Sequence, residues 1–189
     1  MAGNIVIVHG RPGKDEKGAG VSDNKKHWIP WIIEQSILLG LDAHAPQMPE
    51  PWEPEYRKWK GELEKFGVND DSILIGHSAG GAFLVRWLLD TKTRVRALIL
   101  AAPAKSPNPN KEHSEIYEFE VNPLEPNQVA NITVIYSTDD SDWIVSSSEL
   151  YTSKLNAKAV VLDGMGHLTL GDMGTQEFPE LLEEVKKAI

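Results

Sequence analysis

Apolar and polar residues are arranged in blocks along this chain, with short apolar runs separated by longer amphipathic stretches. The apolar runs are continuous rather than alternating, and several are rich in β-branched residues. This pattern is typical of strands that are buried on both faces of a parallel sheet. We predict six such strands, the second of them weak, at residues 5–8, 41–45, 72–75, 95–100, 131–137 and 158–162.

Between these strands, apolar residues recur at helical spacing, and glycines or prolines mark several of the ends. We predict helices at residues 27–39, 55–66, 82–89, 146–155 and 178–189. Strands that alternate with helices of this length indicate an α/β fold, with a mostly parallel sheet covered by helices on both faces. We expect residues 1–189 to form one domain, since a chain of this length can bury a substantial core.

One segment interrupts this alternation. Residues 104–130 contain several prolines, a group of glutamates and one short helical stretch near residues 112–119. Loops of this length are usually functional lids or surface excursions. We therefore keep two interpretations of this segment, a small cap over the active site or a loop tethered to the surface.

The third predicted strand leads into Gly76-His77-Ser78-Ala79-Gly80, and a helical run follows. Gly-x-Ser-x-Gly between a strand and a helix is the nucleophile elbow of an α/β-hydrolase. The turn is so tight that only glycine fits two residues before and two after the serine. We therefore predict that Ser78 is a nucleophile above the carboxyl end of the sheet, and that the N–H of Ala79 faces a developing oxyanion.

A nucleophilic serine needs a base, and the base needs an acid that orients it. In this fold the three follow in the order Ser, Asp or Glu, His. Only His113 and His167 follow Ser78, and only His167 comes directly after a predicted strand. We predict that His167 is the base. Three aspartates after the strand at 131–137 compete for the role of the acid: Asp139, Asp140 and Asp142.

The remaining parts of such a site are an oxyanion hole and an acyl pocket. A second N–H for the oxyanion normally comes from the loop after the first core strand, here His9-Gly10-Arg11-Pro12. We predict the N–H of Arg11, because Pro12 has none, and interpret His9 as a brace for the loop. Trp52 and Trp143 are predicted on loops near the catalytic edge, as candidate walls of the pocket.

Composition narrows the class of protein. Hydrophobic residues make up 41% and charged residues 25%, as in ordinary globular proteins, and the net charge of −9 without a basic cluster argues against a nucleic-acid partner. The chain has no cysteine and no metal-binding motif, so we expect no metal and no cofactor. Without a leader or an apolar stretch of membrane-spanning length, we expect a cytoplasmic protein.

These motifs together resemble the small serine-hydrolase family that includes retinoblastoma-binding protein 9 and the bacterial YdeN-like proteins. The resemblance covers nearly the whole chain, and its motifs are Val-x-Val-His-Gly, His-Trp-Ile-Pro-Trp, Met-Pro, Gly-His-Ser-x-Gly, Ser-Thr-Asp-Asp and Gly-x-Gly-His. It implies an α/β-hydrolase fold with a Ser-His-Asp triad. In relatives the acid is the second Asp of an Asp-Asp pair, which corresponds to Asp140. Relatives usually have a proline soon after that pair, where this chain has Ser141-Asp142, so Asp142 stays as the alternative.

We therefore predict a carboxylesterase-like serine hydrolase with a minimal cap, acting without a cofactor on a small ester, thioester or amide. Its triad would be Ser78, His167 and Asp140. Its substrate would be a small acyl compound, with no membrane and no nucleic acid involved. The alternative is a protein-binding module on the same fold with weak or no turnover, for which the acidic segment and the tryptophans would supply the partner surface.

Overall fold

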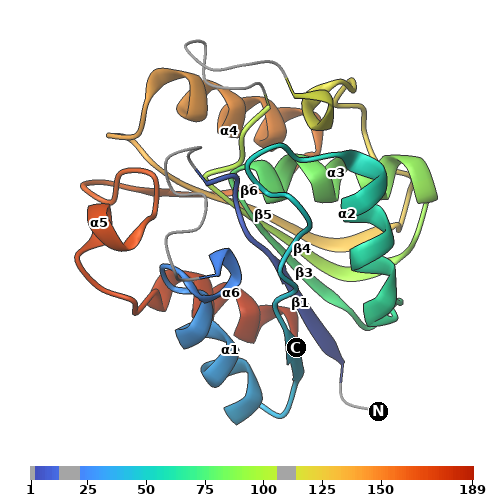
Figure 1. Ribbon diagram of the computed structural model, residues 1–189, viewed down its shortest axis with the longest axis horizontal. Helices are drawn as coiled ribbons and strands as arrows, with labels where there is room; N and C mark the ends of the chain where they lie inside the picture. The colour runs from blue at the N-terminus through green and yellow to red at the C-terminus, as the bar shows by residue number, and fades with distance from the viewer. Residues whose placement is uncertain (1–2, 13–21, 106–113) are drawn as a thin grey trace.

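The fold is built on one parallel sheet. The structure is a computed structural model and describes residues 3–12, 22–105 and 114–189. Six strands pair in the order β2-β1-β3-β4-β5-β6, all parallel (Figure 1). They are β1 (Asn4–Val8), β2 (Asp42–His44), β3 (Ile73–His77), β4 (Val95–Ala101), β5 (Val129–Ser137) and β6 (Lys158–Leu162). The predicted six parallel strands are confirmed.

The central strands are the most deeply buried part of the sheet. Every residue of β3 is buried, and so are the last five residues of β4. Burial on both faces explains why these strands read as continuous apolar runs in the sequence. The edge strand β6 differs, because most of its residues are exposed or only half-buried. The sheet is therefore best protected at β3, the strand that carries the elbow.

Helices cover both faces of the sheet (Figure 1). Helices α1 (Ile29–Leu38) and α6 (Pro179–Ala188) contact each other and lie on one face. Helices α2 (Tyr56–Leu63), α3 (Ala79–Thr91) and α4 (Asp142–Lys154) lie on the other. A one-turn helix, α5 (Leu170–Met173), follows β6. The short 3₁₀ helices are η2 (Asp23–Lys25), η3 (Glu64–Phe66) and η4 (Glu115–Tyr117).

Helix α4 begins earlier than predicted. The predicted start at residue 146 comes after the β-branched pair Ile144-Val145, which disfavours a helix by local propensity. Ile144 is fully buried in the core, and its burial outweighs that propensity. Asp142 in the first turn also suits the positive end of the helix dipole. Trp143 therefore lies in the first turn of α4, and its predicted place on a loop was wrong.

The excursion between β4 and β5 is tied to the helical layer where the structure describes it. The predicted cap includes residues 106–113, which lie outside the described residues. After them, the Glu115 side chain accepts a hydrogen bond from the backbone N–H of Tyr56 (2.6 Å). Arg86 donates to the carbonyl of Glu115 (2.6 Å). These bonds hold η4 against α2 and α3. Whether residues 104–130 form a cap over the active site stays a prediction.

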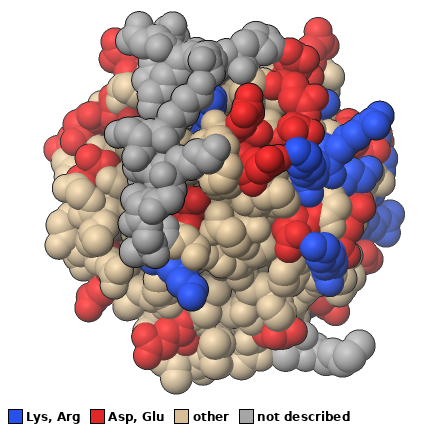
Figure 2. Space-filling view, viewed as in Figure 1, with Lys and Arg blue, Asp and Glu red and all other residues tan. Residues whose placement is uncertain are grey.

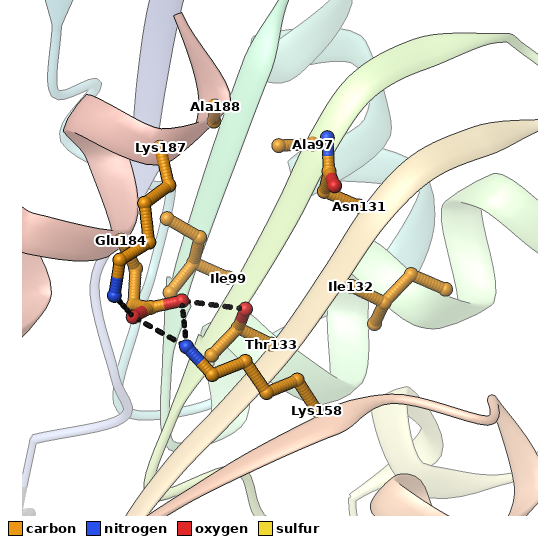
Figure 3. A pocket seen from close by; sticks show the side chains of 9 residues that line it. All are labelled: Ala97, Ile99, Asn131, Ile132, Thr133, Lys158, Glu184, Lys187 and Ala188. Carbon is orange, nitrogen blue, oxygen red and sulfur yellow. Dashed lines mark hydrogen bonds and ion pairs between the residues drawn. The ribbon is translucent and has the colours of Figure 1, made fainter.

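A buried carboxylate fastens α6 to the sheet (Figure 3). Glu184 is only 8% exposed, and it accepts hydrogen bonds from Lys158 (2.7 and 2.8 Å), Lys187 (2.7 Å) and Thr133 (3.3 Å). Burial alone would raise the pKa of Glu184, but the bonds from the two lysines outweigh burial and hold this pKa below its ordinary value. The carboxylate is therefore charged and paired at neutral pH.

A cavity of about 150 Å³ lies beside this carboxylate (Figure 3). Its lining comes from β4, β5, β6 and α6: Ala97, Ile99, Asn131, Ile132, Thr133, Lys158, Glu184, Lys187 and Ala188. The strand residues among them lie within the first five residues of β4 and β5 or at the start of β6. The cavity therefore does not include the carboxyl ends of β4 and β5, the edge at which the elbow lies.

The surface charge is locally balanced on the face that Figure 2 shows. Most Lys and Arg side chains of this face gather at its right edge, where α2 lies in Figure 1, and acidic side chains lie among them. Lys58 of α2 pairs with Glu50 and Glu55, and Lys60 lies 3.8 Å from Glu64. The basic residues of α2 therefore do not form a continuous positive surface.

Candidate active site

The elbow spans the junction of β3 and α3 and has the strained geometry that its sequence predicts. Ser78 has φ 51° and ψ −115°, in the positive-φ region that residues other than glycine rarely enter. A Cβ on Gly80 would lie 2.3 Å from the Val8 carbonyl oxygen, and one on Gly76 would lie 2.7 Å from the backbone of Gly81. Both glycines are therefore required by close approach of the backbone.

Backbone hydrogen bonds fix Ser78 from both sides. Its N–H donates to the carbonyl of Ala101 at the end of β4 (3.0 Å), and its carbonyl accepts from the N–H of Ala104 (3.1 Å). The residue is only 9% exposed. The end of β4 and the residues after it therefore help to keep Ser78 in its strained conformation, which a short turn alone would not maintain.

The structure brings Ser78, His167 and Asp140 into one hydrogen-bonded chain. The Ser78 Oγ lies 3.0 Å from Nε2 of His167, and the Asp140 Oδ2 lies 2.7 Å from Nδ1 of the same ring. A carboxylate only accepts, so Nδ1 carries the proton and Nε2 accepts from the serine hydroxyl. The Asp140 side chain is 5% exposed and that of His167 30%. This arrangement can take a proton from Ser78.

The three competing aspartates have three different environments. Asp140 alone of them contacts the imidazole within the described part of the chain. The Asp139 carboxylate accepts hydrogen bonds from Ser137 and from the N–H groups of Met165 (3.2 Å) and Gly166 (3.1 Å). These bonds, led by that from Ser137, lower the pKa of Asp139. Asp142 begins α4. Asp139 therefore holds the loop that bears His167.

The candidate oxyanion donors lie on either side of the serine. Ala79 is the first residue of α3, where a helical N–H has no acceptor within its own helix. Gly10 follows β1, and a Cβ on it would lie 3.1 Å from the Cβ of Ser78, so the loop that continues into Arg11 passes beside Ser78. The Arg11 side chain donates from Nε to the Trp52 carbonyl (2.9 Å), which joins this loop to the loop after β2.

The two tryptophans proposed as pocket walls are both half-buried. Trp52 lies in a turn of the loop after β2, and Trp143 packs partly against the core from α4. The hydrogen bond from Arg11 to Trp52 places that loop next to the candidate oxyanion hole. Trp143 follows Asp140 by three residues, so the chain itself keeps it near the candidate site.

His9 joins two loops at the carboxyl edge of the sheet. Its Nδ1 lies 2.8 Å from the carbonyl of Gly10, and its Nε2 lies 3.0 Å from the backbone nitrogen of Met48. A carbonyl only accepts and an N–H only donates, so Nδ1 carries the proton and Nε2 does not. Burial lowers the pKa of His9, which keeps this neutral form at pH 7. His9 therefore braces the loop after β1.

Two residues that the sequence analysis did not single out contact the backbone of His167. The ring of His77 lies 2.9 Å from the His167 carbonyl through Nε2, and Asp172 accepts from the His167 N–H (3.1 Å). For Asp172 a signal was available, because Thr169-x-x-Asp172 is a variant of the capping box. For His77 the signal was only its place inside the elbow motif.

The described residues form neither a metal-binding cluster nor a membrane-spanning helix. No group of three His, Asp or Glu side chains in residues 3–12, 22–105 and 114–189 is arranged to hold a metal ion. None of the helices formed by these residues is long and apolar enough to cross a bilayer.

Comparison with known proteins identifies the fold. The YdeN protein of Bacillus subtilis (strain 168) is 22% identical over 187 residues, covering 95% of this chain and 92% of its own. The crystal structure of the B. subtilis ydeN product superposes with a TM-score of 0.83 and 20% identity, covering 99% of this chain and 98% of that one. These findings confirm the resemblance to YdeN-like hydrolases.

More distant solved structures share the fold alone. Est1E from Butyrivibrio proteoclasticus, with ferulic acid bound, has a TM-score of 0.69 and 14% identity, over 99% of this chain and 88% of that one. The 2-hydroxy-6-oxo-6-phenylhexa-2,4-dienoate hydrolase of Rhodococcus sp. strain RHA1 has a TM-score of 0.67 and 16% identity, over 97% and 91% of the two chains. The predicted α/β-hydrolase fold is confirmed.

The family is shown by the sequence itself. The sequence profile described as "Serine hydrolase" matches residues 16–187, which include the elbow, the Asp-Asp pair and the histidine loop. The chain therefore belongs to the serine hydrolase family.

Proposed function

We propose that this protein is a carboxylesterase-like enzyme that cleaves a small ester, thioester or amide through an acyl-enzyme on Ser78. One observation carries the proposal: the continuous hydrogen-bonded chain from the Ser78 hydroxyl through His167 to Asp140. Each of the three follows a different strand, β3, β6 and β5, and they meet where these strands end. A serine on a strained elbow with an oriented base is the arrangement that acyl transfer requires.

In the acylation step, Ser78 attacks the carbonyl carbon of the substrate while Nε2 of His167 takes the hydroxyl proton. Asp140 holds the ring in the tautomer that leaves Nε2 free to accept, and its charge stabilises the imidazolium that forms. The tetrahedral oxyanion is stabilised by the N–H groups of Ala79 and Arg11, each contributing on the order of 3 kcal/mol. His167 then returns the proton to the leaving group, and the acyl-enzyme remains.

In the deacylation step, His167 takes a proton from water, the hydroxide attacks the acyl-enzyme, and Ser78 leaves with the proton restored. The acyl group would lie beside Trp52 and Trp143. Est1E binds ferulic acid, so an aromatic acyl group belongs in a substrate panel beside straight-chain acyl groups.

Labelling with a fluorophosphonate probe tests the proposal. The probe reacts with an activated serine, so we expect rapid labelling of the wild type and none of Ser78→Ala. A series of p-nitrophenyl esters of increasing acyl length, with an aryl ester included, would then define the pocket. If the wild type is not labelled, or Ser78→Ala is labelled as fast, the proposed nucleophile is wrong. An unlabelled, inactive protein that captures a specific protein partner would instead support a binding module.

A further inference from the structure

The backbone of His167 is held by side chains from two other elements. Its N–H donates to Oδ2 of Asp172 in α5 (3.1 Å). Its carbonyl lies 2.9 Å from Nε2 of His77, the last residue of β3. Because a carbonyl oxygen only accepts, Nε2 of His77 carries the proton and donates it. Both polar backbone groups of His167 are therefore bound by side chains, independently of the two bonds made by its ring.

Asp172 is itself held in place. The Thr169 hydroxyl donates to Oδ2 of Asp172 (2.7 Å), and the Asp172 N–H donates back to the Thr169 oxygen (3.3 Å). These reciprocal bonds cap the one-turn helix α5. Gly166 has φ +48°, and a Cβ there would lie 2.8 Å from the Cβ and Cγ of Asp172. The chain before His167 therefore passes directly against this carboxylate.

His77 is buried and uncharged. It is 4% exposed, and its ring lies edge-on to Trp28, with ring centres 5.9 Å apart. Burial, aided by the neighbouring His167 and His27, lowers the pKa of His77 well below its ordinary value. It stays neutral when His167, whose ring centre is 5.1 Å away, becomes an imidazolium. His77 also directly precedes Ser78, so one strand end positions both the nucleophile and the backbone of the base.

The loop that bears His167 needs such support. Gly164, Gly166 and Leu168 all have positive φ, so the loop is a series of tight turns rather than a regular element. In addition, the indole N–H of Trp28 donates to the carbonyl of Leu168 (3.0 Å). Because the ring of His167 is set by its backbone through two rotatable bonds, a shift of the backbone moves Nε2 relative to Ser78.

We propose that His77 and Asp172 are positioning residues, which fix the backbone of His167 so that its ring spans Ser78 and Asp140. The inference rests on the proposed role of His167 as the base. Neither residue touches the reacting atoms, so their loss lowers kcat and leaves substrate binding unchanged. A misplacement of about 1 Å can cost about 100-fold in rate, which sets the upper limit of the effect.

The test compares kcat and KM for a p-nitrophenyl ester in paired variants. Asp172→Ala removes the acceptor, and we expect kcat to fall by about 5–30-fold with KM within about twofold. Asp172→Asn keeps an acceptor oxygen and should recover most of the loss. His77→Leu removes the buried donor and should cost about 10–100-fold, while His77→Gln keeps an N–H and should retain more activity.

The matched control is Asp163→Asn. Asp163 is an exposed carboxylate on the same loop, but it bonds to the Thr138 hydroxyl (2.7 Å) rather than to His167. We expect wild-type kcat for this variant. Thermal unfolding of each variant shows whether it is folded, and the surface position of Asp172 keeps the test valid if His77→Leu does not fold.

A spectroscopic measurement separates positioning from stability. The Nδ1 proton of His167, bonded to Asp140, should give a low-field proton resonance in the wild type, and this resonance should broaden or shift in Asp172→Ala. Unchanged kcat and resonance in Asp172→Ala and His77→Leu would overturn the inference, as would an equal loss in Asp163→Asn. A wild type that no fluorophosphonate labels is a different result, since it rejects the proposed function itself.

Discussion

Replacing Asp140 with Asn gives the sharpest test of the proposed acid, because Asp142 provides a matched control two residues away. Asparagine keeps the size of the side chain but removes its charge. Its amide can also donate to Nδ1, which would favour the tautomer that carries its proton on Nε2. In that tautomer Nε2 cannot accept the proton of Ser78. Asp142 begins α4 and does not contact His167 in the described residues, so Asp142→Asn should leave the rate unchanged.

The magnitude follows from the geometry. The Asp140 oxygen lies 2.7 Å from Nδ1, and its side chain is 5% exposed. Taking the centres of the two delocalised charges as about 4 Å apart, the attraction between carboxylate and imidazolium is about 4 kcal/mol at an effective dielectric constant of about 20. This attraction exists only once His167 is protonated, so its loss raises the barrier by about the same amount. A barrier higher by about 4 kcal/mol lowers kcat about 1,000-fold.

The assay is steady-state hydrolysis of p-nitrophenyl acetate by the wild type, Asp140→Asn and Asp142→Asn, with thermal unfolding to check that each is folded. We expect a fall of about 1,000-fold in kcat for Asp140→Asn alone. The reasoning is refuted if Asp140→Asn retains more than about a tenth of the wild-type kcat, which corresponds to less than about 1.4 kcal/mol. It is also refuted if Asp142→Asn loses as much.

Two further predictions concern stability. Glu184→Gln should destabilise the fold by about 1 kcal/mol at pH 7, measured by denaturant unfolding, since it removes a buried charge that two lysines satisfy. The pKa of Glu184 is lowered in the folded state, so its contribution is present above its ordinary pKa of 4.5 and is lost as the pH falls through the lower folded value. The deficit of Glu184→Gln should therefore disappear in acid, and a deficit independent of pH would contradict this account. Gly80→Ala should lower the melting temperature and abolish fluorophosphonate labelling, because its Cβ would meet backbone atoms at 2.3 and 2.6 Å; a stable, labelled variant would show that the elbow can relax.

The parts of the fold that the sequence predicted are those where one strong local signal coincides with burial. Every residue of β3 is buried, as its continuous apolar run predicts for a central strand. The start of α4 was misplaced because two β-branched residues argue against a helix locally, while burial of Ile144 decides for it. Helix α5 was missed because it has only four residues, and reciprocal side-chain bonds at its cap support it.

The candidate site was predictable in its chemistry but not in its exact assignment. Chain order and strand ends select Ser78 and His167. The choice between Asp140 and Asp142 depends on how the chain turns between β5 and α4. Asp140, Ser141 and Asp142 have similar turn propensities, so the sequence does not determine the geometry of this turn. The resemblance to a family supplied Asp140, which is the aspartate that contacts the ring. The bonds that hold the backbone of His167 join residues up to 90 positions apart, beyond the reach of local pattern.

The position of β6 at the edge of the sheet has a consequence for the order in which the site is completed. His167 follows β6, which pairs on one side only and is largely exposed. A strand with few buried residues belongs to the less stable parts of a structure, which open locally at a lower free energy than global unfolding. Ser78 and Asp140 follow β3 and β5, which lie further inside the sheet, so both residues can be in place while β6 is detached. The reactivity of Ser78 then depends on whether β6 is docked. A partly opened molecule would lose this reactivity while its core is still intact.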